Sequence, residues 1–325
     1  MATTTNNTIE KIAPMFTELL VKKIECLKTD WQKPWITSLK QGLPRNIRGT
    51  VYNGGNVLML LFYTEFMKFS LPVFLTFNQA KEEEVNINKG ARSFPVYYWF
   101  KFVVHKETKK TIKYEEYRKL PATEQENYKV IPQMKYYNVF NIEQTNFAEK
   151  HPERYERMKK NEQPDNHSDG MMFDALDELV YTQNWYCPIK VKYSDSAFYV
   201  SSADYIVCPE KRQFPQGVEF YGTLLHEMAH STGSPQRLNR TFGNFFGDAL
   251  YAREELVAEL TSALCGAFFG YAAAPQDNNA AYLKHWLTKL KEEPAFLVEI
   301  LGDVNKAAKM IAERVTEPIN EPAAA

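Results

Sequence analysis

Apolar positions along the chain follow two periods, and each period predicts one kind of element. A repeat of three to four residues is typical of a helix that buries one face, whereas alternation, or a short run of aromatic and β-branched residues, is typical of a strand. The first pattern predicts helices over 9–27, 56–66, 171–182, 220–233, 251–266, 280–291 and 294–315. The second predicts strands over 94–102, 112–117, 135–142, 197–199 and 204–208, with a strand end and a short helix over 74–80. This mixture predicts an α+β fold.

A polar stretch over 148–170, almost free of apolar residues, divides the chain and is interpreted as a linker. It separates an aromatic-rich α+β domain, residues 1–147, from a mainly helical domain with a small sheet, residues 171–325. Residues 1–147 hold 21 basic and 14 acidic side chains, a net charge of +7, whereas the remainder carries −8. Such an asymmetry suggests two modules with different partners, and a polyanion as the partner of the first.

The N-terminus has no pattern typical of a signal peptide, and no run of about 18 apolar residues indicates a membrane span. The four cysteines are scattered without a pair at zinc-finger spacing, which favours reduced thiols. We therefore expect a cytoplasmic protein with no membrane partner.

The strongest chemical signal lies in the helix predicted over 220–233, which contains His226-Glu-Met-Ala-His230. Histidines four residues apart on a helix project from one face and can bind a single metal ion. Glu227 lies beside them, within reach of a proton on a metal-bound water. The pattern predicts a metal-dependent peptidase with Glu227 as the general base. A strand over 204–208, just before this helix, could bind an extended peptide at a sheet edge.

The third protein ligand decides the type of site. A histidine at 236 would complete the all-histidine set of the metzincins, but Gln236 stands there. The alternative is a carboxylate from the helix predicted over 251–266. We assign Glu255 as the ligand, giving a gluzincin-like site, and Glu259 as the acceptor of a hydrogen bond from a ligand imidazole. Glu254 remains the rival ligand, and the predicted metal is Zn²⁺, although spacing alone also admits Mn²⁺ or another divalent ion.

The strands predicted in the first half are rich in aromatic side chains, interleaved with Arg92, Lys101 and Lys135. Aromatic faces beside cations are what sequence-tolerant binding of single-stranded nucleic acid requires. Aromatic residues in strands also form ordinary hydrophobic cores, so composition alone leaves both interpretations open.

Several motifs accompany the histidine pentapeptide. The first half contains Trp31-x-x-Pro-Trp35, Leu43-Pro-Arg-Asn46, Tyr52 with Gly54-x-Asn56, Thr76-Phe-x-Gln-Ala80 and Val139-Phe-Asn-x-x-Gln144. The second half contains Asp204-x-Ile206, Thr232-Gly233, Arg237-Leu-Asn-Arg240 and Tyr251-Ala-Arg-Glu-Glu-Leu-x-Ala-Glu259. This combination spans nearly the whole chain and resembles the ArdC family of plasmid antirestriction proteins, which is related to the N-terminal portion of TraC-type primases.

The resemblance implies an N-terminal domain that binds single-stranded DNA, joined to a zincin-like metallopeptidase domain. It also implies that the protein protects incoming mobile DNA from restriction during conjugation. The expected partners are single-stranded DNA and an unidentified protein or peptide substrate. Candidate DNA contacts are Trp31, Trp35, Arg45, Tyr52, Lys89, Arg92, Tyr98 and Lys101.

Two other functions stay open. One is a non-catalytic protein that coats single-stranded DNA and keeps a vestigial metal site, and the other is a regulatory protease that cleaves a repressor. Glu227 favours an enzyme over the first of these, because a purely structural metal site needs no general base.

Overall fold

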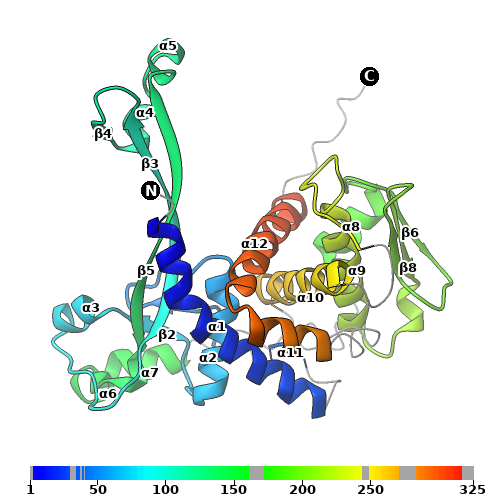
Figure 1. Cartoon of the computed structure of the whole chain (residues 1–325). Coiled ribbons are helices and arrows are strands. Elements are labelled where there is room, and N and C mark those ends of the chain that lie inside the picture. The colour runs from blue at the N-terminus through cyan, green and yellow to red at the C-terminus, as the bar shows by residue number, and fades with distance from the viewer. Residues whose placement is uncertain are drawn as a thin grey trace, which may run out of the picture.

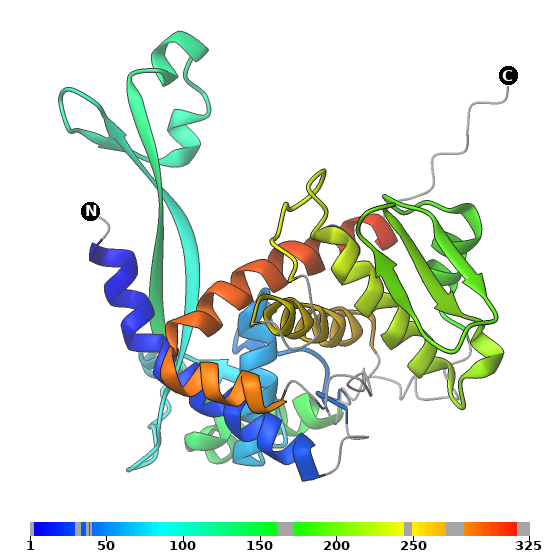
Figure 2. The ribbon, with the colours of Figure 1, turned by 45° about the vertical axis from the view of Figure 1, so that its right-hand side comes forward.

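The computed structural model describes residues 3–29, 34–36, 39, 41–160, 172–243, 249–270 and 283–316. Helices are combined with two sheets in these residues, which confirms the α+β class (Figure 1). An N-terminal half with a long projecting hairpin lies beside a mostly helical C-terminal half (Figures 1 and 2). Across the described segments, no helix has both the length and the apolar run needed to cross a membrane.

The N-terminal half is built on a sheet with strand order β1-β2-β5-β3-β4. Its strands are β1 (Arg45–Asn46), β2 (Val73–Leu75), β3 (Phe94–His105), β4 (Thr111–Ile112) and β5 (Tyr128–Asn141). β3 and β5 form the projecting hairpin and pair antiparallel from Phe94↔Val139 to His105↔Tyr128. Residues 94–97 are buried at its base, whereas Tyr98 and Trp99 begin its exposed part.

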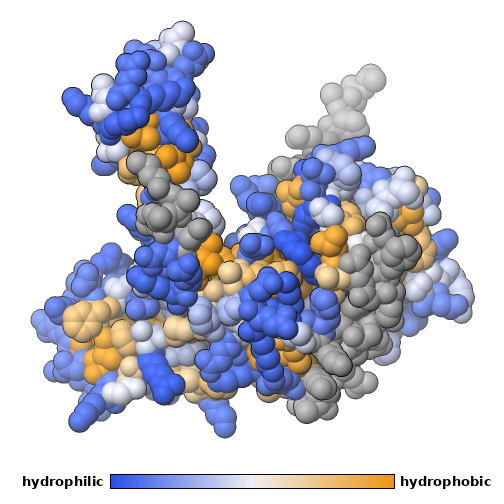
Figure 3. All heavy atoms as spheres, viewed as in Figure 1, coloured by the Kyte–Doolittle hydropathy of each residue, from blue (hydrophilic) through white to orange (hydrophobic). Residues whose placement is uncertain are grey.

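The far end of the hairpin differs from the strand expected over 112–117. The strand β4 ends at Ile112, and α4 (Tyr114–Tyr117) and α5 (Ala122–Gln125) are short helices. The backbone N–H of Lys113 donates to the Glu116 carboxylate (3.3 Å), and this contact favours the start of α4 over continuation of the strand. Hydrophilic residues cover much of this end (Figure 3).

The helices of this half are α1 (Thr3–Thr29), α2 (Gly55–Met67), α3 (Phe77–Glu82), η1 (Ile142–Gln144), α6 (Phe147–Lys150) and α7 (Pro152–Lys160).

Part of the segment interpreted as a linker is folded. Tyr155 and Met158 of α7 pack against a small core, and Arg154 pairs with Glu83 (2.5 Å). The linker interpretation is therefore wrong for 148–160, where a polar helix buries only a narrow face. Residues 161–171 lie outside the described residues.

The C-terminal half combines a small sheet with a group of helices. In the sheet, β6 (Ile189–Lys192) is parallel and β7 (Phe198–Val200) antiparallel to the central β8 (Tyr205–Pro209). The helices are α8 (Asp174–Thr182), η2 (Lys211–Gln213), α9 (Gly217–Thr232), α10 (Ala249–Phe269), α11 (Leu283–Glu292) and α12 (Ala295–Thr316). The helices predicted over 220–233 and 251–266 are thereby confirmed as α9 and α10.

The two halves share one hydrophobic core. It joins Phe16 of α1 and Leu58 of α2 to Leu260 of α10 and Leu301 of α12. α10 contacts α2, α9, α11 and α12, so every residue from 254 to 267 is buried. A helix enclosed in this way also buries its polar side chains, and those must find partners.

Asn305 of α12 joins the two halves at the start of α2. Its Oδ1 accepts a hydrogen bond from the backbone N–H of Gly55 (2.5 Å). Gly54 precedes Gly55 with a positive φ of 55°, and a side chain there would collide with the Asn305 carboxamide. No side chain at Gly54 can cap α2, so Asn305 supplies the acceptor from another part of the chain.

Replacing Asn305 with Ala removes this acceptor, and we expect the free energy of unfolding to fall by about 1 kcal/mol. Asn305→Asp keeps an oxygen that faces the first turn of α2, so we expect its free energy of unfolding to fall by less than that of Asn305→Ala. Urea unfolding followed by circular dichroism measures both variants. Equal losses would contradict the capping role.

Candidate metal centre and nucleic-acid interface

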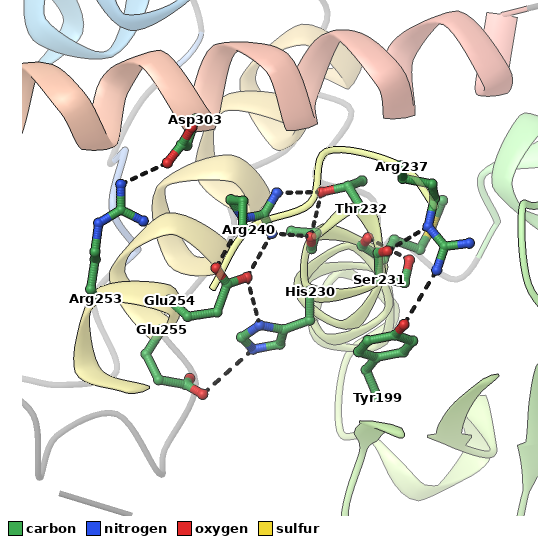
Figure 4. Close-up of polar contacts among 12 residues, drawn as sticks. Tyr199, His230, Ser231, Thr232, Arg237, Arg240, Arg253, Glu254, Glu255 and Asp303 are labelled. Atoms are coloured by element: carbon green, nitrogen blue, oxygen red, sulfur yellow. Dashed lines mark hydrogen bonds and ion pairs between the residues drawn. The ribbon is translucent and has the colours of Figure 1, made fainter. Parts of the chain in front are cut away.

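Helices α9 and α10 pack against each other and bring His226, His230 and Glu255 together. One possible ligand atom from each side chain lies within 4.8 Å of those from the other two. The histidines are one turn apart on α9, and their Nε2 atoms are 3.0 Å apart. Glu255 reaches the same point from α10, with Oε2 3.4 Å from Nε2 of His226 and Oε1 3.5 Å from Nε2 of His230. Figure 4 shows Glu255 and His230 facing each other.

This set of donors fits a divalent metal ion. Two imidazole nitrogens and a carboxylate suit zinc, and the same set is acceptable to manganese. Each of the three residues is buried, with 9% or less of its surface exposed. The two Nε2 atoms point at the same buried position. A cation there would bind both nitrogens, whereas a hydrogen bond between them requires one nitrogen to carry a proton and the other to lack one.

Glu254, the rival ligand, lies behind His230 (Figure 4). Its Oε1 is 3.3 Å from Nδ1 of His230, the ring nitrogen that faces away from the other ligands. Arg240 donates two hydrogen bonds to this carboxylate, from Nη2 (2.6 Å) and from Nε (2.9 Å). Burial would raise the pKa of the Glu254 carboxyl group, but the bonds from Arg240 outweigh it and the pKa is lowered. Glu254 is therefore ionised and able to orient the ring of His230.

Glu259 lies behind His226, where the sequence analysis places a hydrogen-bond acceptor. Its Oε1 is 3.9 Å from Nδ1 of His226, and Nδ1 has no hydrogen-bond partner among the described residues. Its Oε2 accepts a hydrogen bond from the indole Nε1 of Trp35 (2.7 Å). The expectation that Trp35 contacts DNA is wrong, because its side chain is fully buried in this contact.

Glu227 follows His226 on α9 and is also buried. Burial raises the pKa of its carboxyl group, although the two imidazoles and a backbone hydrogen bond from Tyr199 act in the opposite direction. At Glu255 burial acts the same way, but His230 and His226 outweigh it, so the pKa of Glu255 is lowered. Neighbouring carboxyl groups with opposite shifts suit different tasks, a raised pKa for proton transfer and a lowered one for binding a cation.

The two histidines respond to the same surroundings. Burial lowers the pKa of each imidazole, yet the carboxylates on both sides outweigh burial. The pKa of His226 is raised, and that of His230 is raised further because Glu255 and Glu254 both face it. The centre is therefore strongly electronegative, which favours a cation.

Two arginines after α9, Arg237 and Arg240, hold the helix that carries the histidines. Arg240 donates to the Thr232 hydroxyl (2.8 Å) and to the Ala229 carbonyl (2.8 Å), besides Glu254. Arg237 donates to the Ser231 carbonyl (2.6 Å). Both arginines belong to the motif Arg237-Leu-Asn-Arg240, but the spacing of a motif does not show which groups a loop arginine reaches.

The sheet edge next to the site is β7. The strand over 204–208, expected to bind a peptide at its edge, is the central β8, so that expectation is corrected. Arg237 connects β7 to α9, since it pairs with Asp204, which also accepts a hydrogen bond from the Tyr199 hydroxyl (2.7 Å). Figure 4 shows Tyr199 and Arg237 beside the end of α9. The edge strand is thereby held close to Glu227.

A row of aromatic rings lies on one face of the hairpin. Its rings are those of Tyr98, Phe100 and Tyr137, and Tyr98 lies 6.1 Å from each of the other two by ring centroids. Lys135 pairs with Tyr98 across the strands and places its ammonium group 4.6 Å from the ring of Phe100. Tyr98 and Tyr137 are 46% and 39% exposed, so their faces can be reached by a ligand. Tyr98 is one of the DNA contacts predicted from the sequence, whereas Phe100 and Tyr137 are not.

The other candidate DNA contacts differ in exposure. Those with exposed side chains are Lys89, Arg92 and Lys101. Arg45 is half-buried, with burial lowering its pKa, and it donates to the Gln41 carbonyl (2.8 Å). Tyr52 is half-buried and packs edge-on against Phe74. Trp31 lies outside the described residues.

Comparisons with known proteins cover both halves. Residues 10–140 match the family model of the N-terminal domain of the anti-restriction factor ArdC, and residues 174–300 match that of a zincin-like metallopeptidase. The chain is 28% identical to a DNA primase TraC of Escherichia coli over 323 residues, which is 94% of this chain and 28% of TraC. A second TraC of E. coli is 29% identical over 297 residues, and the match covers 89% of this chain and 19% of that protein. The chain thus spans less than a third of these relatives.

Solved structures extend the comparison to the fold. The antirestriction protein ArdC from plasmid R388 has crystal structures in a metal-free and an Mn(II)-bound form, with TM-scores of 0.65 and 0.66 to this chain at 26% identity. Each match covers 94% of this chain, and 97% or 98% of the R388 protein. Sequence and fold agree across the hairpin half and the metal-site half, and this chain belongs to the ArdC family of antirestriction proteins.

Proposed function

We propose that this protein is an antirestriction-type protein of a mobile element, which binds single-stranded DNA and carries a zinc-dependent peptidase site. The observation that carries the proposal is the convergence of His226, His230 and Glu255, with Glu227 next to the first histidine. The match to the ArdC N-terminal domain and the aromatic row support the binding of single-stranded DNA. The Mn(II)-bound form of the R388 protein supports a divalent ion, with Mn²⁺ as the alternative to Zn²⁺.

His226 and His230 would hold the ion through their Nε2 atoms, and Glu255 through its carboxylate. A divalent metal bound there supplies Lewis acidity and lowers the pKa of a coordinated water. Glu254 and Glu259 lie at the two Nδ1 atoms and orient the imidazoles. The three carboxylates of α10 that face the two rings therefore restrict the orientation of the imidazoles.

Glu227 takes a proton from the attacking water and returns it to the leaving amine of the peptide. Its raised pKa makes the carboxylate a better base near neutral pH than an exposed glutamate. β7 offers the backbone groups of a sheet edge to a peptide in extended conformation. The substrate is expected to be an extended segment of a protein partner.

The hairpin provides the surface for single-stranded DNA. The aromatic row would stack against bases, and the exposed cations Lys89, Arg92 and Lys101 would neutralise phosphates. The protein would act in the cytoplasm of the cell that receives the mobile DNA. In this proposal one molecule holds the incoming strand with one half and cleaves a protein with the other.

Glu255→Gln and Glu254→Gln, at adjacent positions of α10, separate a ligand from a group that orients one. We expect E255Q to weaken Zn²⁺ and Mn²⁺ binding by more than about 100-fold, because it removes a charged ligand, and E254Q to weaken it about 10-fold. Isothermal titration calorimetry measures both. A larger loss in E254Q would make Glu254 the ligand, and unchanged affinity in both variants would refute the site.

Glu227→Gln should keep the metal and slow hydrolysis of an unfolded protein such as casein by about 100- to 10,000-fold, because the general base is lost. Glu178→Gln, an exposed change on α8, serves as the control and should keep its activity. Undiminished proteolysis in E227Q would sink the mechanism. If E227Q stops proteolysis but a conjugation assay still shows antirestriction, a protein that coats single strands is the better description.

Tyr98→Ala removes one stacking surface, and we expect affinity for a fluorescently labelled single strand to fall roughly tenfold, since stacking contributes about 1–3 kcal/mol per base. Tyr181→Ala, which changes an 87% exposed tyrosine on α8, should leave affinity unchanged. Fluorescence anisotropy over a salt series, with duplex as competitor, makes the measurement. Equal losses in both variants, or no preference for the single strand, would count against the hairpin.

A further inference from the structure

A tryptophan of the N-terminal half reaches the metal centre of the C-terminal half. Trp35 is fully buried, and its Nε1–H donates a 2.7 Å hydrogen bond to Oε2 of Glu259, 224 positions later in the chain. Glu259 in turn places Oε1 3.9 Å from Nδ1 of His226. The three side chains therefore connect the N-terminal half to a ligand of the proposed metal site.

Burial makes this bond one of the contacts that orient the Glu259 carboxylate. The residue is 1% exposed, so water cannot solvate its charge and hydrogen-bond donors must stabilise it. An indole Nε1–H donates and cannot accept, so it favours the ionised carboxylate and does not compete for the imidazole proton. With Oε2 engaged by Trp35, Oε1 is the oxygen that faces His226.

The imidazole of His226 needs such an acceptor. Its Nδ1 is buried and makes no hydrogen bond to the residues that the structure describes. An imidazole that binds a metal through Nε2 carries its proton on Nδ1, and the acceptor of that proton fixes both the tautomer and the angle of the ring. A movement of about 1 Å would bring Oε1 of Glu259 to hydrogen-bonding distance.

We propose that Trp35 is a positioning residue of the metal centre: it orients Glu259, and Glu259 orients His226. The inference rests on the proposed metal site and names a group outside it. The same arrangement occurs at the second histidine, where Arg240 holds Glu254 behind His230. Arg240 lies in the loop after α9, whereas Trp35 belongs to the other half, so the centre is complete only when the halves are packed together.

Apolar packing fixes the position of the indole. Its ring lies 6.3 Å from the ring of Phe62 on α2, and Ile36 and Leu39 are buried in the same core. Because α2 contacts α10 directly, a displacement between these helices would move Trp35 relative to Glu259. The orientation of a metal ligand thus depends on how the N-terminal half is seated.

The test compares two buried tryptophans that both donate to α10. Trp35→Phe removes the bond to Glu259 and keeps an aromatic ring. Trp286→Phe removes an indole bond to the backbone carbonyl of Ala252 (2.6 Å) and is the matched control. Calorimetry of the whole chain with Zn²⁺ and with Mn²⁺ gives affinities, and the visible absorption of Co²⁺-loaded protein reports the geometry of the ligands.

We expect W35F to bind Zn²⁺ and Mn²⁺ about tenfold more weakly, in the range typical of losing a group behind a metal ligand. The Co²⁺ absorption should change in W35F, whereas W286F should match the wild type in both measurements. E259Q should weaken binding at least as much as W35F. Adding W35F to E259Q should cause no further loss, because Trp35 acts through Glu259.

Each outcome decides a different point. Wild-type affinity and spectrum in W35F would overturn this inference and leave the proposed metal site intact. A wild-type chain that binds no metal would overturn the proposed function, and this inference with it. Should W35F fail to fold, E259Q alone decides, because unchanged metal affinity in E259Q would exclude a role for the Trp35–Glu259 pair.

Discussion

Burial of three carboxylates on a single helix is the constraint on which the structure depends. Glu254, Glu255 and Glu259 of α10 are only 3%, 7% and 1% exposed. An isolated buried charge is strongly destabilising, so each carboxylate requires a partner of its own. Those partners come from three places in the chain: Arg240 in the loop after α9, the two histidines of α9, and Trp35 of the N-terminal half. The chemistry of α10 therefore determines which elements must surround it.

The groups that converge on the proposed metal position could be predicted because helical spacing is local. Because they are four residues apart on a helix, His226 and His230 share a face of α9 independently of the rest of the fold. Glu255 is one of few carboxylates on the next long helix. Spacing could not choose between Glu254 and Glu255, because neighbouring residues on a helix point about 100° apart and the choice depends on where α9 lies. The structure places Glu255 at the two Nε2 atoms and Glu254 behind His230.

What could not be predicted are contacts between distant segments and the order of strands. Trp35 follows a proline in a stretch without helical or strand periodicity, so the sequence could not show that its indole donates to Glu259, 224 positions later. Residues 148–160 are polar, but the few apolar side chains of α7 complete a core formed earlier in the chain. The α+β class followed from local patterns, whereas the identity of β7 as the edge strand required the sheet itself.

The shared core also changes how the two family matches should be understood. One model ends at residue 140 and the other begins at residue 174, as if two modules were joined end to end. Yet α1 packs on α11 and α12, and Asn305 of α12 contacts both Gly55 and the hydroxyl of Tyr97 at the base of the hairpin. Close-packed side chains transmit a displacement instead of absorbing it. Tyr97 and Asn305 therefore connect the base of the hairpin to α12, and α12 packs directly on the helix that carries Glu255.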